Sequence, residues 1–265
     1  MSKKVAIVTG GTSGIGRATA LALQECGYTV YELSRRAEGM PDIRHIVADI
    51  TKEETLQAAV EQVLAAEGRL DLVVNNAGFG ISGAIEFTDT QEAQRLFDTL
   101  FFGMVRMNRC VIPLMRQQGH GRIVNISSVA APVPIPFQAY YSAGKAAINA
   151  YTMALANELR PFGVTVCAVM PGDIKTGFTA ARHKIIDGDD IYQGRIGRSV
   201  QRMEHDEQTG MDPAKVGRYI AAVASREGCR HPLYATRIDY KFFVFLTKVL
   251  PARFLNWLIY QLYGK

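Results

Sequence analysis

The sequence predicts an α/β fold built around a doubly wound parallel sheet. Short apolar runs alternate with helical patterns along much of the 265-residue chain, and the first run enters a glycine-rich turn that leads into a helix. Repeated strand–helix alternation favours right-handed crossovers and a sheet with helices on both faces. We expect one Rossmann-like domain over residues 1–265, because this length buries a full core without disulfides or metal.

The predicted elements follow these runs in order. Strands are expected at Val5–Thr9, Thr29–Leu33, Arg44–Ala48, Leu70–Asn75, Arg122–Ile126 and Val164–Val169. Helices are expected at Gly14–Cys26, Lys52–Glu67, Gln91–Gln118 and Ala139–Arg160. Ligands of such sheets collect at the carboxyl ends of the strands. Gly10, Asn76, Ser128 and Pro171 each follow a predicted strand, so they should meet in one crevice.

The glycine-rich turn spans Gly10 to Gly16 and predicts a phosphate or pyrophosphate site. Backbone N–H groups at a helix N-terminus attract an anion, and the missing Cβ atoms allow close approach. The spacing is G-x-x-x-G-x-G, and Arg17-Ala18 stands where a P-loop requires Lys-Ser/Thr. The turn therefore favours a dinucleotide over a P-loop nucleotide.

Tyr141 and Lys145 are four residues apart on a predicted helix, so the phenol and the ammonium project from one face. A free phenol titrates near about 10 and exchanges protons poorly at neutral pH. A nearby cation favours the phenolate, and we expect Lys145 to lower the pKa of Tyr141 toward the working range.

Through a set of ordered motifs, the chain resembles the short-chain dehydrogenases/reductases over about residues 3–176. The motifs are Thr9–Gly16, Asp49, Asn75–Gly78, Asn125–Ser128 with Tyr141 and Lys145, and Pro171–Thr176. The family's spacing of thirteen positions selects Ser128 over Ser127, and Tyr140 is excluded because Gly144 follows it at i+4. The Ser34-Arg35 pair and the apolar C-terminus are similar to the 17β-hydroxysteroid and retinol dehydrogenase-like branch.

The resemblance implies a role for each site residue. Tyr141 would donate a proton to a carbonyl oxygen, Ser128 would hydrogen-bond that oxygen, and Lys145 would also hold the nicotinamide ribose. The implied cofactor-binding residues are Gly10, Thr12, Ser13, Gly14, Ile15, Gly16, Ser34, Arg35, Asp49, Ile50, Asn76, Ala77, Gly78, Tyr141, Lys145, Pro171, Gly172, Ile174 and Thr176. Asp49 would reach the adenine, or cap the helix that starts near Lys52, or do both.

The end of the second strand predicts a preference for NADP. An NAD site favours an acid there, whereas this chain has Ser34-Arg35-Arg36. A guanidinium fits the 2′-phosphate of NADP by charge-assisted bonding, and we expect Arg35 to be the main contact. Glu32 lies within the strand and Glu38 beyond the turn.

The function predicted from these residues is NADP-dependent hydride transfer between the nicotinamide and a carbonyl or secondary alcohol of a bulky apolar substrate. That substrate would be steroid-, retinoid- or lipid-like. The alternative is a dinucleotide-binding regulatory or scaffold protein that has lost turnover. A hydrolase is disfavoured, because no G-x-S-x-G elbow is present.

Leu100 departs from the family pattern. The resemblance places an asparagine at this position, where it is thought to hold water that connects the lysine to solvent. Leucine cannot hydrogen-bond, so either backbone groups hold that water, or the relay is impaired, or the change is packing only. Asn108 is two turns further on and is not expected to substitute. If the relay is impaired, Leu100→Asn should raise kcat, and this is the outcome we favour from the sequence.

Composition places the protein in a reducing compartment. The four cysteines, Cys26, Cys110, Cys167 and Cys229, are scattered among apolar neighbours and predict buried thiols. Ser2-Lys3-Lys4 leads directly into the first strand, so we expect no signal peptide and a cytoplasmic location. The net charge of +5 comes from dispersed residues, which disfavours nucleic acid, and the five histidines have no metal-ligand spacing.

Two segments after Pro171 have a different character. Residues 177–210 are polar and poorly periodic, which predicts a mobile substrate lid or a disordered surface insertion. Residues 240–265 carry two apolar helical patterns separated by Pro251, both too short to span a bilayer. This extension would roof an apolar pocket, pack in a homodimer or homotetramer, or rest on a membrane as a peripheral contact.

Overall fold

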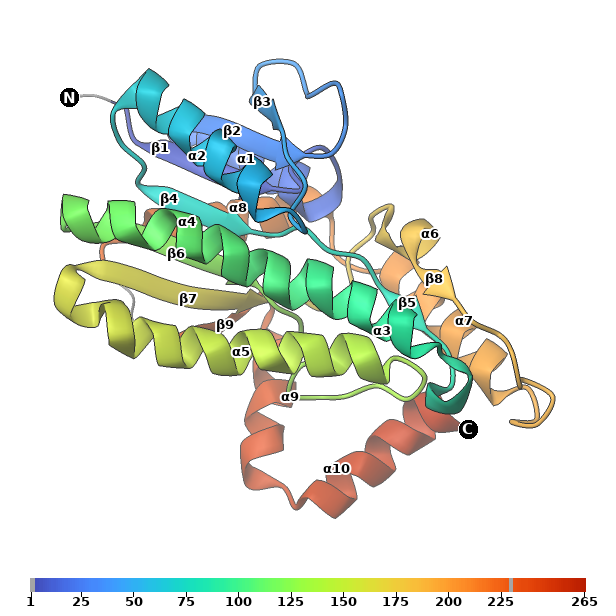
Figure 1. The fold of residues 1–265 in the computed structure, drawn as a ribbon. Coiled ribbons are helices and arrows are strands. Elements are labelled where there is room, and N and C mark those ends of the chain that lie inside the picture. The colour runs from blue at the N-terminus through green and yellow to red at the C-terminus, as the bar shows by residue number, and fades with distance from the viewer. Residues whose placement is uncertain (1–2, 229–230) are drawn as a thin grey trace.

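Seven parallel strands form the central sheet of the computed structural model, which describes residues 3–228 and 231–265. Their order across the sheet is β3-β2-β1-β4-β6-β7-β9 (Figure 1). The strands are β1 Val5–Thr9, β2 Thr29–Ser34, β3 Arg44–Val47, β4 Leu72–Asn75, β6 Gly121–Ile126, β7 Val164–Met170 and β9 Leu233–Ala235. This order and the helices around it confirm the predicted doubly wound, Rossmann-like fold.

Helices cover both faces of the sheet because its strands are apolar on both sides. One core cluster packs Ala6 and Val8 against α1 (Gly14–Glu25) and α8 (Pro213–Ser225). The other packs Val5 and Ile7 against α2 (Glu53–Glu67), α4 (Gly103–Gln118) and α5 (Ala139–Leu159). All five residues of β1 are buried, as predicted for a strand covered on both faces.

The predicted elements are confirmed to within one or two residues, with one subdivision. The expected helix Gln91–Gln118 consists of α3 (Thr90–Phe97), a π-helical segment Asp98–Phe102 and α4. Strand β9 is absent from the sequence prediction, because its three residues are too short to show a period. A two-stranded sheet of β5 (Ile81–Ser82) and β8 (His183–Lys184) is also absent from it.

The strand order reverses between β1 and β4, and this arrangement creates the crevice at the carboxyl edge. β1 pairs with β2 on one side and with β4 on the other, all in parallel. The connection after β1 crosses one face and the connection after β4 crosses the other, so their end loops diverge. Such a switch point is where doubly wound sheets bind ligands.

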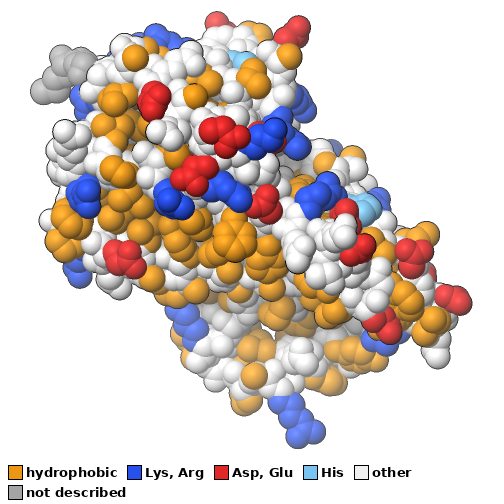
Figure 2. Space-filling model, in the orientation of Figure 1, with side chains coloured by type: hydrophobic (Ala, Val, Ile, Leu, Met, Phe, Trp, Pro, Cys, Tyr) orange, Lys and Arg blue, Asp and Glu red, His pale blue; other side chains and the backbone are white. Residues whose placement is uncertain are grey.

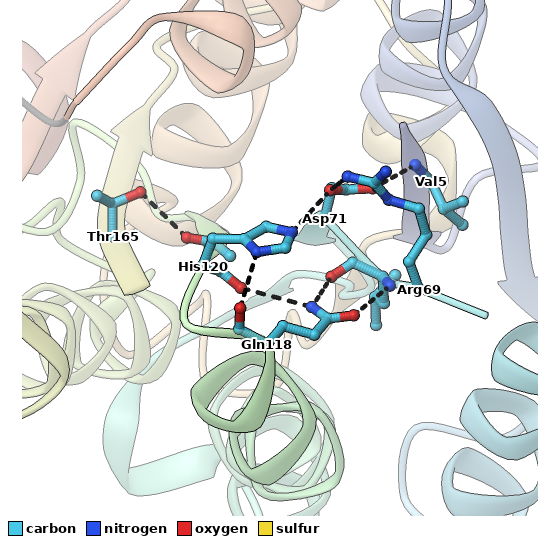
Figure 3. A network of polar contacts seen from close by, with 8 residues as sticks. Val5, Arg69, Asp71, Gln118, His120 and Thr165 are labelled. Carbon is cyan, nitrogen blue, oxygen red and sulfur yellow. Dashed lines mark hydrogen bonds and ion pairs between the residues drawn. The ribbon is translucent and has the colours of Figure 1, made fainter. Parts of the chain in front are cut away.

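A polar network secures the opposite, amino edge of the sheet (Figure 3). The buried carboxylate of Asp71 accepts hydrogen bonds from the Val5 N–H at 2.8 Å and from Arg69 Nε at 2.9 Å. Gln118, at the end of α4, donates to the carbonyl oxygen of Leu70 and accepts from its N–H. Burial raises the pKa of Asp71, but the hydrogen bonds from Arg69 and the Val5 N–H to its carboxylate outweigh burial. They hold the pKa below its ordinary value. The network therefore joins β1, β4 and α4 at the amino edge of the sheet, on the side opposite the crevice.

The segment 177–210 is structured, which contradicts the disordered insertion that the sequence left open. It contains α6 (Phe178–Ala181), β8 and α7 (Arg195–Gln208). Ile196, Val200 and Met203 form a buried face of α7, so its pattern is amphipathic despite its many charges. The role of this segment as a lid remains a prediction.

The C-terminal extension forms two helices, as predicted. α9 (Ile238–Val249) and α10 (Ala252–Ile259) meet at Leu250-Pro251 and project from the body (Figure 1). The chain end returns to α7, where Arg195 Nε donates to the Gly264 carbonyl oxygen at 2.5 Å and Tyr263 donates to Asp206 at 2.9 Å. Within the described residues, no helix combines the length and the apolar character that a membrane span requires.

The cysteine prediction is partly wrong. Cys167 is a buried thiol in β7, but Cys26 is exposed and Cys110 is half-buried. Cys26 caps the end of α1, where the chain turns at Gly27 toward solvent, so its apolar sequence neighbours do not cover it. Cys229 lies outside the described residues.

Candidate functional site

The glycine-rich turn brings backbone against backbone at the start of α1. Gly10 and Gly14 have φ of +65° and +52°, a region that favours glycine. A Cβ on Gly16 would lie 2.3 Å from the Gly10 carbonyl oxygen and 2.4 Å from Asn76 Nδ2. Ser13 is the N-cap residue of α1, and its side chain makes no capping bond within the described chain. The first N–H groups of α1 are therefore available to an anion, as the sequence predicts.

Asn76 fixes this turn to the end of β4. Its Nδ2 donates to the carbonyl oxygens of Thr9 at 3.0 Å and Gly10 at 3.3 Å. The Thr9 hydroxyl accepts from the N–H groups of Asn76 and Ala77 at 3.0 and 3.1 Å. The side chain of Asn76 thus supports the glycine turn, and residues 76–78 line the crevice through their backbone.

Asn75 lies in a separate buried network. Its Nδ2 donates to Asn108 Oδ1 at 2.8 Å and to Asn125 Oδ1 at 2.9 Å, and Asn125 donates to Thr152 at 2.9 Å. These bonds join β4, α4, β6 and α5 beneath the crevice. Asn108 belongs to this network and makes no bond to Lys145, in agreement with the expectation that it does not replace Leu100.

The residues predicted for the adenosine half lie at the ends of β2 and β3. Arg35 is exposed, and its charge contributes to lowering the pKa of Asp49. Glu32 is fully buried under the glycine turn, where its carboxylate pairs with His45 and receives a 3.5 Å bond from Ser34. The carboxylate of Glu32 is therefore buried inside the fold, while the guanidinium of Arg35 faces solvent.

Asp49 does not cap α2, so this part of the expectation is wrong. The N-cap residue is Lys52, whereas one Asp49 oxygen accepts from the backbone and the hydroxyl of Thr51 at 3.0 and 2.8 Å. Burial raises the pKa of Asp49, but the Thr51 bonds and Arg35 bring it below the ordinary value. Ile50, next in the chain, approaches Gly103 at the start of α4.

The loop Pro171–Thr176 closes the crevice on the other side of the sheet. The Val129 N–H donates to the Pro171 carbonyl oxygen at 2.9 Å, and Thr176 lies 3.5 Å from where a Gly14 Cβ would be. The ring of Tyr240 packs on Gly172, and its hydroxyl accepts from the Asp173 N–H at 3.0 Å. Ile174 is buried against the β1 face of the core. This loop therefore contacts both the glycine turn and α9.

The predicted Ser-Tyr-Lys set comes together between β6 and α5. Lys145 is buried, its Nζ lies 5.5 Å from the Tyr141 ring centroid, and it donates to the Ile126 carbonyl oxygen at 2.7 Å. Ser128 faces the Tyr141 phenol closely enough to lower its pKa. Ser127 instead donates to the Lys145 carbonyl oxygen at 3.0 Å, which fixes α5 to β6. The structure thus places Ser128, not Ser127, beside the phenol.

The expected effect of Lys145 on Tyr141 is wrong for this structure. Burial raises the pKa of Tyr141 to about 12, and Ser128 opposes the rise. Burial also lowers the pKa of Lys145 to about 7, so near neutral pH the amine is a weak source of positive charge. The phenol therefore keeps its proton at neutral pH, which is the form that donates to a carbonyl oxygen.

Leu100 lies in the π-helical segment between α3 and α4, 2% exposed. It packs with Ile81, Leu96 and Ile185, and with the rings of Tyr140 and Tyr141. Its methyl groups also fill the space beside Gly78 and Gly144. These neighbours favour the packing role over the impaired relay, contrary to the outcome favoured from the sequence.

We therefore expect Leu100→Asn to reduce stability without a gain in turnover. An amide left unpaired in this apolar cluster costs about 1–3 kcal/mol of the free energy of unfolding. Denaturant unfolding and kcat measured on the same variant test this, with Leu100→Met as a volume-matched apolar control. A faster variant of unchanged stability would restore the relay hypothesis.

Three residues beside the site belong to none of the motifs recognised in the sequence. Phe178 of α6 has its ring centroid 5.7 Å from that of Tyr141, and Arg182 stacks over Phe178 at 5.6 Å. Tyr240 covers Gly172 from α9. All three lie far from Tyr141 in the sequence and join the site only in the folded chain. The charge of Arg182 and the polar context of segment 177–210 were the only sequence cues.

A surface hollow of about 390 Å³ does not coincide with these residues. It lies between Phe87–Glu92 and His183–Asp187, and its lining combines charged side chains with Phe87, Ile185 and Ile186. None of the residues of the converging motifs lines this hollow, so the candidate site lies apart from it.

Comparison with known proteins identifies the family. Residues 4–185 match the short chain dehydrogenase family model. A 3-ketodihydrosphingosine reductase of Bacteroides thetaiotaomicron is 38% identical over 97% of this chain and 94% of its own. A short-chain dehydrogenase of Streptomyces avermitilis superposes with a TM-score of 0.82 at 34% identity, covering 92% of each chain. A protein called ElxO, solved with NADP bound, gives a TM-score of 0.75 at 26% identity, over 91% of this chain and all of its own.

The chain belongs to the short-chain dehydrogenase family. It is therefore an oxidoreductase that uses a nicotinamide dinucleotide and acts on a small molecule. Solved neighbours carry NAD in some cases and NADP in others. The glycine-rich turn at Gly10–Gly16 and the uncapped start of α1 fit the pyrophosphate of either cofactor.

Proposed function

We propose that this protein is an NADP-dependent reductase of a carbonyl group on a bulky, lipid-like substrate, working reversibly on the matching secondary alcohol. The observation that carries the proposal is the convergence of Ser128, Tyr141 and Lys145 at the edge where the glycine turn begins α1. Full-length similarity to the Bacteroides reductase, named for the lipid ketone 3-ketodihydrosphingosine, supports the substrate class.

The proposed chemistry divides between cofactor and protein. A bound nicotinamide dinucleotide supplies the hydride for the carbonyl carbon. As negative charge develops on the carbonyl oxygen, the Tyr141 phenol gives it a proton and the Ser128 hydroxyl donates a hydrogen bond to it. The product is a secondary alcohol, and the phenolate recovers its proton from solvent. Lys145, 5.5 Å from the ring, stabilises that phenolate when protonated.

Residues of this chain would hold the cofactor along the whole edge. The first turn of α1 would face the pyrophosphate, and Asp49 and Ile50 would face the adenine. The backbone of Asn76–Gly78 would face the adenosine ribose. The nicotinamide would lie against Pro171, Gly172, Ile174 and Thr176. Arg35, exposed at the end of β2, would bind the 2′-phosphate that distinguishes NADP, while the buried Glu32 faces away from it.

The direct experiment is a panel of long-chain ketones and alcohols, each assayed with NADPH/NADP and NADH/NAD by cofactor absorbance. We expect turnover of a lipid-like ketone with NADPH. Tight NADPH binding with no turnover of any ketone or alcohol would favour the alternative, a dinucleotide-binding regulatory protein. The presence of all three candidate catalytic residues argues against that alternative.

The C-terminal hairpin, defined as residues 238–265, is proposed to rest on a membrane surface. Its exposed residues include Phe242, Phe245 and Val249 on α9, and Phe254 and Trp257 on α10. Lys241, Lys248, Arg253 and Lys265 accompany them, against a single acid, Asp239. Apolar rings with basic neighbours match the interface of anionic lipids, from which a lipid-like substrate would come.

We expect the protein to co-sediment with vesicles that contain anionic phospholipid, and less with purely zwitterionic ones. Phe245→Ser with Trp257→Ser should weaken this binding by about tenfold or more. Each ring contributes about 1.5–3 kcal/mol when it moves from water into the lipid. Phe162→Ser, an exposed ring outside the hairpin, is the control. Binding unaffected by the hairpin substitutions would contradict the proposal.

A second exposed apolar area favours self-association. Figure 2 shows a broad band of hydrophobic side chains over the region of α4 and α5. Phe102, just before α4, and Met153 on α5 are 49% and 42% exposed. We propose a homo-oligomer, a dimer or tetramer, through this band. Light scattering should report at least twice the 29.2 kDa chain mass, and Met153→Lys should shift the protein toward monomer. A monomeric wild type would refute this. The proposed location is cytoplasmic, where cysteine thiols such as those of Cys26 and Cys110 stay reduced.

A further inference from the structure

A buried guanidinium next to the candidate site has unused donors. Arg182 follows α6, and its side chain has no exposed surface. Its Nη2 pairs with Glu207 of α7, whose other oxygen accepts from the Thr179 hydroxyl at 2.5 Å. Among the described residues, Nε and Nη1 of Arg182 have no hydrogen-bond partner. Buried donors without partners are rare, because each has lost its water and gained nothing in exchange.

This guanidinium lies close to the proposed proton donor. Phe178 connects the two, with its ring 5.7 Å from the Tyr141 ring and 5.6 Å from Arg182 Cζ. The charges of both Arg182 and Glu207 also act on the Tyr141 phenol. An ion pair thus lies directly behind Phe178, the ring that flanks Tyr141, although an apolar substrate alone would favour apolar groups there.

We propose that Arg182, held in place by Glu207, recognises a neutral oxygen acceptor that the substrate carries a few bonds from its reactive carbonyl. The inference rests on the proposed function and names a feature of its substrate. A guanidinium only donates, so the partner is an acceptor. Glu207 already balances its charge, which favours a hydroxyl or carbonyl oxygen over a carboxylate or phosphate.

Access to Arg182 and access to Tyr141 are linked through Phe178. A carbonyl that meets the phenol takes the position beside the Tyr141 ring that Phe178 holds in this structure. Because Phe178 also covers Arg182, its displacement uncovers the guanidinium nitrogens at the same time. A substrate with an oxygen near its ketone satisfies those donors, whereas a plain ketone leaves them unpaired.

The test compares two ketones of equal chain length, a long-chain 3-ketone with a hydroxyl on carbon 1 and the same ketone without it. For the wild type we expect kcat/KM to be at least tenfold higher for the hydroxylated ketone. In the double variant Arg182→Met with Glu207→Gln, which removes both charges together, this ratio should fall to about one. The kcat/KM for the plain ketone should stay within a few-fold of wild type.

Controls separate recognition from structure. Lys184→Met with Glu204→Gln removes a more exposed ion pair of the same segment and should preserve the ratio. Arg182→Lys retains the positive charge but not the planar set of guanidinium N–H donors, so it should lower the kcat/KM ratio of the two ketones. This single variant also provides the test if the double variant does not fold. A wild-type ratio near one, or an equal loss on both ketones, would overturn the inference while leaving the proposed function intact. Failure of the wild type to reduce either ketone would overturn the proposed function itself.

Discussion

Tyr141→Phe is expected to lower kcat by about 10²- to 10⁴-fold, the range that a positioned proton donor contributes. The substitution deletes only the hydroxyl, which Ser128 contacts, and leaves the ring against Phe178 and Leu100. Lys145 keeps its bond to Ile126, so the cofactor side of the site is unchanged. The loss should therefore appear in kcat, while NADPH affinity and melting temperature stay close to wild type.

The neighbouring tyrosine provides a matched control. Tyr140 packs in the same apolar cluster but has Gly144, not a lysine, one turn further on. Tyr140→Phe should retain most of the activity. Turnover of Tyr141→Phe within a few-fold of wild type would show that another group is the acid. Steady-state kinetics with fluorescence titration of NADPH distinguishes these cases.

Arg35→Ala is expected to weaken NADP binding by about 10- to 100-fold and to change NAD binding little. A hydrogen bond to a charged group contributes about 1.5–3 kcal/mol, and each 1.4 kcal/mol is tenfold in affinity. Arg35 is exposed at the end of β2 near Asp49, whereas Glu32 is buried and paired with His45. NAD lacks the 2′-phosphate, so it loses no direct partner when the guanidinium is removed.

Arg36→Ala is the appropriate comparison for this experiment. Arg36 is equally exposed and one residue further along the turn, where its carbonyl oxygen accepts from His45. Titration of both cofactors into both variants gives the NADP/NAD affinity ratio. A ratio that Arg35→Ala leaves unchanged would refute the assignment, and a ratio that only Arg36→Ala changes would transfer the role to Arg36.

The central sheet was predictable from sequence because its strands contain short runs that are mostly apolar, and because glycine or asparagine follows several of them. The apolar runs Val5–Thr9 and Val164–Val169 are typical of buried strands. The glycine-rich turn Gly10–Gly16 marks the start of the helix that connects the first two strands. The Tyr141–Lys145 pair was predictable as well, because a helix brings i and i+4 together, whereas Ser128 was implied only by the resemblance to the family. The elements at the periphery, β9 and the β5–β8 pair, have two or three residues each and are defined by long-range pairing alone.

The electrostatics of the site could not be predicted in the same way. The sequence showed a cation one turn from a phenol, and the Coulomb effect alone lowers the phenol's pKa. The structure adds burial of both groups, and burial opposes charge on each, so the pKa of Tyr141 rises and that of Lys145 falls. Arg182 and Glu207 were out of reach for a related reason, since neither has a sequence motif and their pairing depends on how α6 and α7 pack.

The contact between Tyr240 and the loop Pro171–Thr176 has a mechanical consequence. The ring packs on Gly172 and the hydroxyl bonds both the N–H and the carboxylate of Asp173, at 3.0 and 3.2 Å. At its other end the hairpin holds α7 through Gly264 and Tyr263. The hairpin therefore connects the loop Pro171–Thr176 to α7. A protein shortened before residue 238 to improve its handling would lose this connection, and the loop beside the candidate site would loosen together with the tail.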